Sequence, residues 1–233
     1  MKRVNINDLW YYPVPIMSEP RAELDFLFNG PASAPLNLAL AHGAGSPMDS
    51  DFMNAFAEGL AAQGRGRWRI ARFEFPYMVA RRADGRRRPP NPESMLLATW
   101  RGAIAALGPE RLVIGGKSLG GRMASMVADE SGVAGLVCLG YPFHPTGKPE
   151  KPRVDHLVDL KTPTLIVQGT RDPFGNEAEV QRYPLSRAVS MHWIEGGDHN
   201  LAPRKSTGRS VARTWAEAIS AMGDFLSRLQ GGP

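Results

Sequence analysis

A serine flanked by glycines stands in the segment Gly116-Lys117-Ser118-Leu119-Gly120. The mostly apolar run RLVI, which precedes this segment, predicts a strand, and the residues after it predict a helix. A tight turn between a strand and a helix strains the serine backbone and exposes its hydroxyl at the end of the strand. Glycines two residues before and two residues after allow the neighbouring strand and helix to come close. The segment predicts that Ser118 is a nucleophile that attacks a carbonyl carbon.

A base must take the proton of such a serine, because a hydroxyl is a poor nucleophile near neutral pH. Of the five histidines, His199 lies in the turn EGGDHN after a predicted strand, where a projecting loop can reach Ser118. We therefore predict that His199 is the base. The main competitor is His144, as a residue that faces the substrate. The other histidines lie in a predicted strand, in a loop and in the turn HGAG: His192, His156 and His42.

A carboxylate should orient the base. Asp172 stands in GTRDPFG, just beyond a predicted strand, so it too lies at the carboxyl end of a strand. Asp198 is the alternative, but it is adjacent to His199 in the sequence and is poorly placed to bond its imidazole. Three further carboxylates are expected in exposed loops or at helix ends: Asp155, Asp159 and Glu177.

Hydrogen-bond donors must stabilise the oxygen of an attacked carbonyl group. One predicted donor is the N–H of Leu119, directly after the nucleophile. The second is predicted in the loop of LALAHGAGSP, where we expect the N–H of Ala44, with that of Gly45 next. His42 is expected to brace this loop by a hydrogen bond and not to transfer protons.

The elements that position these residues follow from apolar runs that alternate with amphipathic stretches. Strands are predicted at residues 24–28, 36–41, 69–75, 111–115, 135–140, 163–169 and 189–194, and helices at about 51–63, 93–107, 119–129, 176–181 and 210–229. This pattern predicts an α/β fold with a mostly parallel sheet of about seven strands and helices on both faces. The first two strands are expected to form an antiparallel pair at one edge, because the connection NGPASAP is too short for a crossover helix.

The chain of 233 residues is interpreted as one domain, 1–233, long enough to bury a core without disulfides or metals. Its single cysteine, Cys138, excludes a disulfide framework and a cysteine-rich zinc site, and we predict no cofactor and no metal. No apolar run approaches the roughly 20 residues of a membrane span, and no secretory signal is evident. We therefore expect a cytoplasmic protein that does not bind membranes.

The net charge is +5 at pH 7, and five arginines crowd residues 81–88. Residues 78–92 are expected to form a loop at the rim of the site, where Arg81 and Arg82 would hold an acidic group of a substrate. The alternative is a solvated surface loop. The cluster has no interleaved aromatic residues and lies on no predicted helix, so no nucleic-acid partner is expected.

The motifs HGAG, GGKSLGG, GTRDPFG and GGDHN, in this order between residues 36 and 200, resemble those of the α/β-hydrolase superfamily. The sequence is similar to a small capless group, related to dienelactone hydrolases and to the hydrolase-like domain of a testis-expressed protein and of a chromatin NSL-complex subunit. The resemblance implies a capless fold with Ser118, Asp172 and His199 as the triad. Dienelactone hydrolases use a cysteine nucleophile where this chain has Ser118, so the resemblance does not extend to their specific reaction.

The residues favour a carboxylesterase-like serine hydrolase that cleaves an ester or thioester of a small substrate, neutral or acidic, through an acyl-enzyme. A peptidase that acts on short peptides is the alternative within the same chemistry. A catalytically silent, hydrolase-like scaffold that binds a partner is the alternative outside it. The sequence predicts neither the acyl group nor the oligomeric state.

Overall fold

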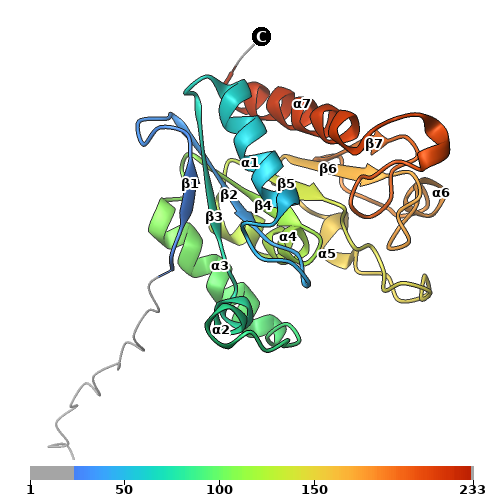
Figure 1. Ribbon diagram of the computed structural model, residues 1–233, viewed down its shortest axis with the longest axis horizontal. Coiled ribbons are helices and arrows are strands. Elements are labelled where there is room, and N and C mark those ends of the chain that lie inside the picture. The colour runs from blue at the N-terminus through green and yellow to red at the C-terminus, as the bar shows by residue number, and fades with distance from the viewer. Residues whose placement is uncertain (1–23, 232–233) are drawn as a thin grey trace, which may run out of the picture.

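The apolar runs form one seven-stranded sheet in the computed structural model, which describes residues 24–231 (Figure 1). In chain order the strands are β1 (Leu27–Asn29), β2 (Leu36–Ala41), β3 (Trp68–Phe73), β4 (Leu112–Lys117), β5 (Gly135–Leu139), β6 (Thr164–Gly169) and β7 (Val189–Ile194). Across the sheet their order is β1-β3-β2-β4-β5-β6-β7, and all neighbours are parallel except β1 and β3. The prediction of a mostly parallel sheet of about seven strands is confirmed.

Helices cover both faces of this sheet, as predicted (Figure 1). They are α1 (Asp51–Gly64), α2 (Pro76–Asp84), α3 (Glu93–Leu107), α4 (Leu119–Ser131), α5 (Asp155–Val158), α6 (Glu177–Val180) and α7 (Val211–Leu229). Helices α1 and α7 pack together on one face, and α3 and α4 pack together on the other.

The alternation of side chains along each strand explains why both faces are apolar. In β5, Val137 joins the core beneath α1 and α7, whereas Leu136 and Cys138 join the core beneath α3 and α4. The fully buried rings of Phe56 from α1 and Trp100 from α3 fill the two cores. Because parallel strands buried on both faces offer little room for polar groups, the polar side chains that could do chemistry gather near the strand ends.

Strand β1 does not pair with β2, which corrects the expectation of an antiparallel pair formed by the first two strands. It pairs antiparallel with β3 at the edge of the sheet, with Leu27 opposite Arg72. Strand β2 already has β3 and β4 as parallel partners, because the connection through α1 returns β3 to the side of β2 that a hairpin would have occupied.

The arginine-rich segment is partly helical, which corrects the expectation of a loop over residues 78–92. Helix α2 begins with Pro76 in its first turn and is followed by Gly85 at φ +71°. Proline at the start and glycine just past the end are typical helix signals. Strand β3 accordingly ends at Phe73, before the predicted boundary, and Arg81 and Arg82 lie in the last turn of α2.

The carboxyl edge of the central strands carries no cap domain in the described residues, as predicted. The connection from β5 to β6 contains only α5, a helix of four residues. The turns after β2, β4, β6 and β7 therefore meet at an open edge.

No helix in residues 24–231 has both the length and the apolar composition that crossing a membrane requires.

Candidate active site

Ser118 occupies a strained turn between β4 and α4. Its backbone lies at φ +49° and ψ −111°, a conformation that side chains other than glycine rarely adopt. A Cβ atom at Gly116 or at Gly120 would clash with the carbonyl oxygen of Ala41 in β2. Both glycines are therefore required by the close approach of the neighbouring strand, as the motif predicts.

The structure brings Ser118, His199 and Asp172 together in a hydrogen-bonded chain, although they come from three turns. The Nε2 atom of His199 lies 2.9 Å from the Oγ atom of Ser118. Its Nδ1 atom lies 2.8 Å from the Oδ2 atom of Asp172. In this arrangement Nδ1–H donates to the carboxylate, so Nε2 is left free to accept the serine proton.

The carboxylate of Asp172 is fully buried and held from both sides. The N–H of Phe174 donates to its Oδ1 atom at 2.9 Å, and the side-chain amide of Gln168 donates to Oδ2 at 3.0 Å. These donors keep one carboxylate oxygen aimed at His199. The ring of Phe174 also lies 4.4 Å from the imidazole, centroid to centroid, and limits its rotation.

Asp198, the alternative acid, has a different task in the structure. Its Oδ1 atom accepts hydrogen bonds from the N–H groups of Asn200, at 2.8 Å, and Ala202, at 3.0 Å. The side chain therefore folds back over its own turn and shapes the loop that carries His199.

The loop after β2 is braced by hydrogen bonds that turn its carbonyl groups away from the cavity. Burial lowers the pKa of His42, and its neutral ring accepts from the N–H of Phe75 at 3.2 Å and donates to the carbonyl of Gly43 at 2.7 Å. The hydroxyl of Tyr77 donates to the carbonyl of Ala44 at 3.2 Å. Because the C=O and N–H of one trans peptide point in opposite directions, the N–H of Ala44 points away from the ring of His42.

A cavity of about 480 Å³ opens beside this chain of residues. Ser118, His199 and Ala44 line it, and Leu119 directly follows Ser118 as the first residue of α4, where its N–H has no partner within the helix. The apolar part of the lining comes from three side chains that the sequence analysis did not single out: Phe52, Met53 and Phe174. Their signal is an apolar side chain that follows a predicted catalytic turn: Phe174 comes shortly after Asp172, and Phe52 and Met53 lie in the first turn of the helix after HGAG.

A second cavity, of about 420 Å³, lies between β7 and α7, and His192 and Glu217 line it. None of the predicted catalytic residues reaches it.

The three residues predicted to bind substrate have partners within the protein, and their substrate role stays a prediction. Arg81 donates to the carbonyl of Gly45 at 3.0 Å, and Arg82 contacts Glu74 at 2.8 Å and Asp49 at 2.5 Å. None of the predicted three lines the cavity at Ser118.

His144, the third of them, is buried, with its Nε2 atom 3.3 Å from a carboxylate oxygen of Glu179. It is therefore hydrogen-bonded within the protein and does not line the cavity at Ser118.

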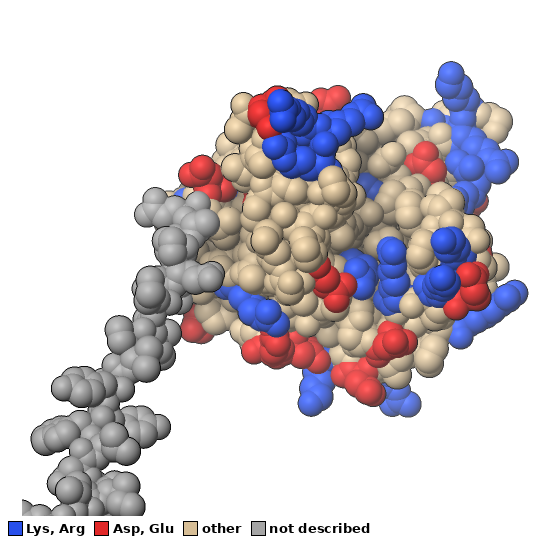
Figure 2. Space-filling view, turned by 90° about the horizontal axis from the view of Figure 1, so that it is seen from below, with Lys and Arg blue, Asp and Glu red and all other residues tan. Residues whose placement is uncertain are grey.

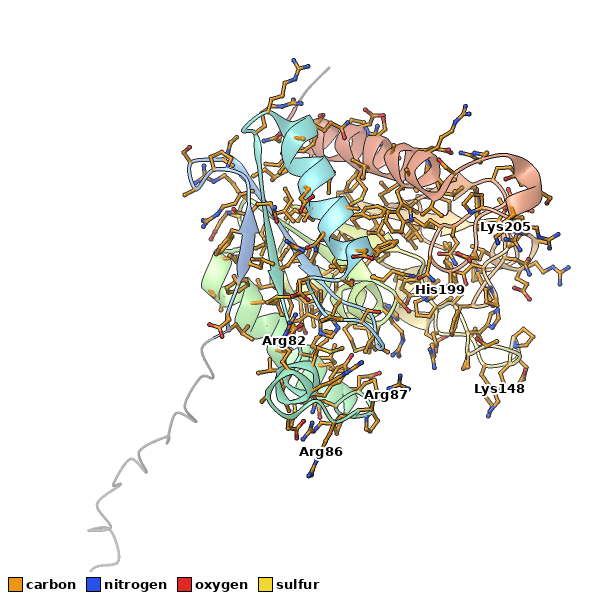
Figure 3. All side chains as sticks on the ribbon, in the orientation of Figure 1. Arg82, Arg86, Arg87, Lys148, His199 and Lys205 are labelled. Carbon is orange, nitrogen blue, oxygen red and sulfur yellow. The ribbon has the colours of Figure 1, made fainter. Side chains whose placement is uncertain are left out.

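The remaining arginines of the cluster project from the surface. Arg86 and Arg87 lie on the loop at the lower edge of the molecule, apart from His199 (Figure 3). On the face seen from below, Lys and Arg side chains form separate groups with Asp and Glu side chains among them (Figure 2). Helix α2 directs Arg81 and Arg82 toward the loop after β2.

Replacement of Arg82 by alanine is expected to lower stability and to spare catalysis. The change leaves the buried carboxylate of Glu74 without its cation, and an uncompensated group of this kind costs about 1–3 kcal/mol in the free energy of unfolding. Urea denaturation measures this loss, and kcat/KM for a neutral ester should stay within about twofold. The matched control is Arg87→Ala at an exposed position, which should change neither quantity. A large fall in kcat/KM in Arg82→Ala alone would instead support the substrate-binding interpretation.

Lys117 is the most notable residue that the sequence analysis left without a role. It ends β4, is buried, and lines the cavity. Its signal in the sequence is a single charged residue at the end of an otherwise apolar strand. In residues 24–231, no group of three or more His, Cys, Asp and Glu side chains is arranged to hold a metal ion.

Comparisons with known proteins agree with this architecture. A family model described as an alpha/beta hydrolase domain matches residues 34–227. Among solved structures, the esterase domain of a Rhodothermus marinus protein is 15% identical, with a TM-score of 0.62 over 88% of this chain and 98% of that chain. A serine hydrolase without a lid from Xanthomonas campestris is 14% identical, with a TM-score of 0.62 over 90% of each chain. A monoacylglycerol lipase from Paleococcus ferrophilus is 15% identical, with a TM-score of 0.63 over 89% of this chain and 99% of that chain.

Proposed function

The chain belongs to the alpha/beta hydrolase domain family, and from this premise we propose that it is a serine hydrolase that cleaves esters or thioesters of small substrates. The observation that carries the proposal is the continuous hydrogen-bonded chain from Ser118 through His199 to the buried Asp172, at the wall of a cavity. Such a chain activates a serine hydroxyl, which a purely structural serine does not require.

In the proposed mechanism, the Oγ atom of Ser118 attacks the carbonyl carbon while Nε2 of His199 takes its proton. The carbonyl electron pair moves to the oxygen, and the N–H groups of Leu119 and Ala44 donate to the oxyanion. As the tetrahedral intermediate collapses, His199 gives the proton to the leaving group. Water then repeats the sequence on the acyl-enzyme and frees Ser118. Asp172 stabilises the imidazolium in both halves.

The dimensions of the cavity favour a small acyl group. Its volume of about 480 Å³ is in the lower half of the usual range for small-molecule sites, which is about 300–1,000 Å³. Phe52, Met53 and Phe174 offer an apolar wall for the acyl chain. The open edge leaves the alcohol or thiol part of the substrate in solvent. We propose a small-molecule substrate and no nucleic-acid partner.

Ester cleavage is favoured over peptide cleavage. A peptidase must also orient several residues of an extended chain, whereas this cavity is local to Ser118. An esterase domain and a monoacylglycerol lipase stand among the similar structures, at identities at which the likeness shows the fold alone. Matched ester and amide substrates with the same acyl group separate the two activities.

The proposal is tested by labelling the purified protein with a fluorophosphonate and locating the adduct by mass spectrometry. We expect one adduct, on Ser118, that is lost in His199→Ala because the base is absent. The matched control is His156→Ala, since the Nε2 atom of His156 lies 2.8 Å from the hydroxyl of Ser125, away from the cavity. That variant should label like the unchanged protein. A folded protein without an adduct on Ser118 would instead support the scaffold interpretation.

A further inference from the structure

Lys117 links the nucleophile turn to the loop that carries the base. It directly precedes Ser118 at the end of β4, and its ammonium donates a hydrogen bond to the main-chain carbonyl of His199. Within residues 24–231 this ammonium is the single hydrogen-bond donor to that carbonyl. Only 7% of the surface of Lys117 is exposed, which is unusual for a lysine without a specific role.

The surroundings of the ammonium are shaped to accommodate it. Gly140, after β5, has φ +62°, and a Cβ atom there would stand 2.8 Å from the Nζ atom of Lys117 and 3.3 Å from the Nδ1 atom of His199. The missing side chain of Gly140 thus makes the space that the ammonium and the imidazole share. On the other side, the ring of Phe52 lies 5.4 Å from Nζ, centroid to atom, where its π electrons attract a cation.

The charge of Lys117 is balanced by its neighbours. Burial lowers the pKa of Lys117 to about 8, and the carboxylates of Asp172 and Asp198 oppose this effect. His199 is the third titratable group that faces the ammonium, whereas Phe52 from α1 and Gly140 after β5 bring none. Near neutral pH most Lys117 side chains therefore carry a positive charge beside the imidazole.

We propose that Lys117 is a positioning residue of this hydrolase, whose ammonium holds the carbonyl of His199 and so keeps the imidazole between Ser118 and Asp172. The inference rests on the proposed function, since it assigns a task to Lys117 in that same site. Two consequences follow. Without the ammonium, the base moves more freely, and a misplacement of about 1 Å costs on the order of 100-fold in rate. Without its positive charge, the protonated imidazole becomes more stable, so the pKa of His199 rises.

Replacement of Lys117 by methionine, which has a similar length and no charge, tests both consequences. We expect kcat for an ester to fall by about 10- to 100-fold while KM stays within about threefold, because the cavity that binds the acyl group is retained. The acidic limb of the profile of kcat/KM against pH should shift upward by roughly half a unit or more. Lys148→Met is the matched control, since Lys148 is exposed and lies apart from His199 (Figure 3), and it should change neither quantity.

An NMR titration of His199 in substrate-free protein tests the inference independently of turnover. We expect a higher pKa of His199 in Lys117→Met than in the unchanged protein. If Lys117→Met does not fold, as judged by circular dichroism, Lys117→Gln keeps a polar donor without the charge and serves for the same comparison.

The outcomes separate the two proposals. If the unchanged protein labels and hydrolyses esters, but Lys117→Met retains kcat within twofold and the same pKa of His199, the role of Lys117 is refuted and the hydrolase stands. A protein that neither labels nor hydrolyses, but whose His199 pKa rises on replacement of Lys117, refutes the proposed function while the coupling of ammonium and imidazole is supported.

Discussion

Replacement of Ser118 by alanine is expected to lower kcat for ester hydrolysis by about five to six orders of magnitude. The hydroxyl oxygen is the atom that forms the acyl-enzyme. Within residues 24–231, no other side chain is hydrogen-bonded to Nε2 of His199. The oxyanion donors and the cavity remain, so a residual acceleration of about a thousandfold over the uncatalysed reaction should persist. Steady-state kinetics with a chromogenic ester, together with the loss of the fluorophosphonate adduct, measure the effect.

The control for this variant is Ser46→Ala, because Ser46 lines the same cavity without a histidine partner. Its kcat should stay within about fivefold of the unchanged protein. Hydrolysis by Ser118→Ala at more than a hundredth of the original rate would show that a different nucleophile, or water activated directly by His199, performs the reaction.

Local signals explain why this part of the site could be predicted from the sequence. The spacing of Gly116, Ser118 and Gly120 is typical of a strained turn between a strand and a helix. The conformation of that turn determines where the hydroxyl of Ser118 points. Asp172 and His199 follow apolar strands, and the ends of parallel strands meet at one edge of a sheet. The geometry of the three residues therefore follows from features that short segments already contain.

The roles of the basic residues could not be predicted in the same way, because they depend on contacts distant in the sequence. Arg82 is bound by Asp49, 33 residues away, and the carbonyl partner of Lys117 is 82 residues away. Such contacts follow from the packing of α2 against the loop after β2 and of β7 against β6. The pairing of β1 with β3 could not be predicted for a similar reason, since it depends on which side of β2 is occupied by β3.

The buried lysine and the buried aspartate have complementary electrostatic effects on the base. Asp172 stabilises the imidazolium that forms during the reaction, whereas the ammonium of Lys117 favours the neutral imidazole that begins it. The two charged residues therefore act on opposite protonation states of the imidazole. The acid and the positioning residue are therefore best tested as separate contributions.

Replacement of Asp172 by asparagine is expected to reduce kcat by about 10⁴-fold with little change in KM. Asparagine fits the same buried space and still accepts from the N–H of Phe174, so the turn should be preserved although the hydrogen bond from Gln168 is lost. Its amide group, however, favours the tautomer of His199 in which Nε2 carries the proton, and this nitrogen then cannot accept from Ser118. The charge that stabilises the imidazolium is lost as well.

Asp198→Asn is the matched control, because its amide oxygen can still accept from Asn200 and Ala202, and kcat should fall by less than about tenfold. If the large loss appears in Asp198→Asn and not in Asp172→Asn, the acid of the triad is Asp198, and the loop that carries His199 must rearrange during turnover.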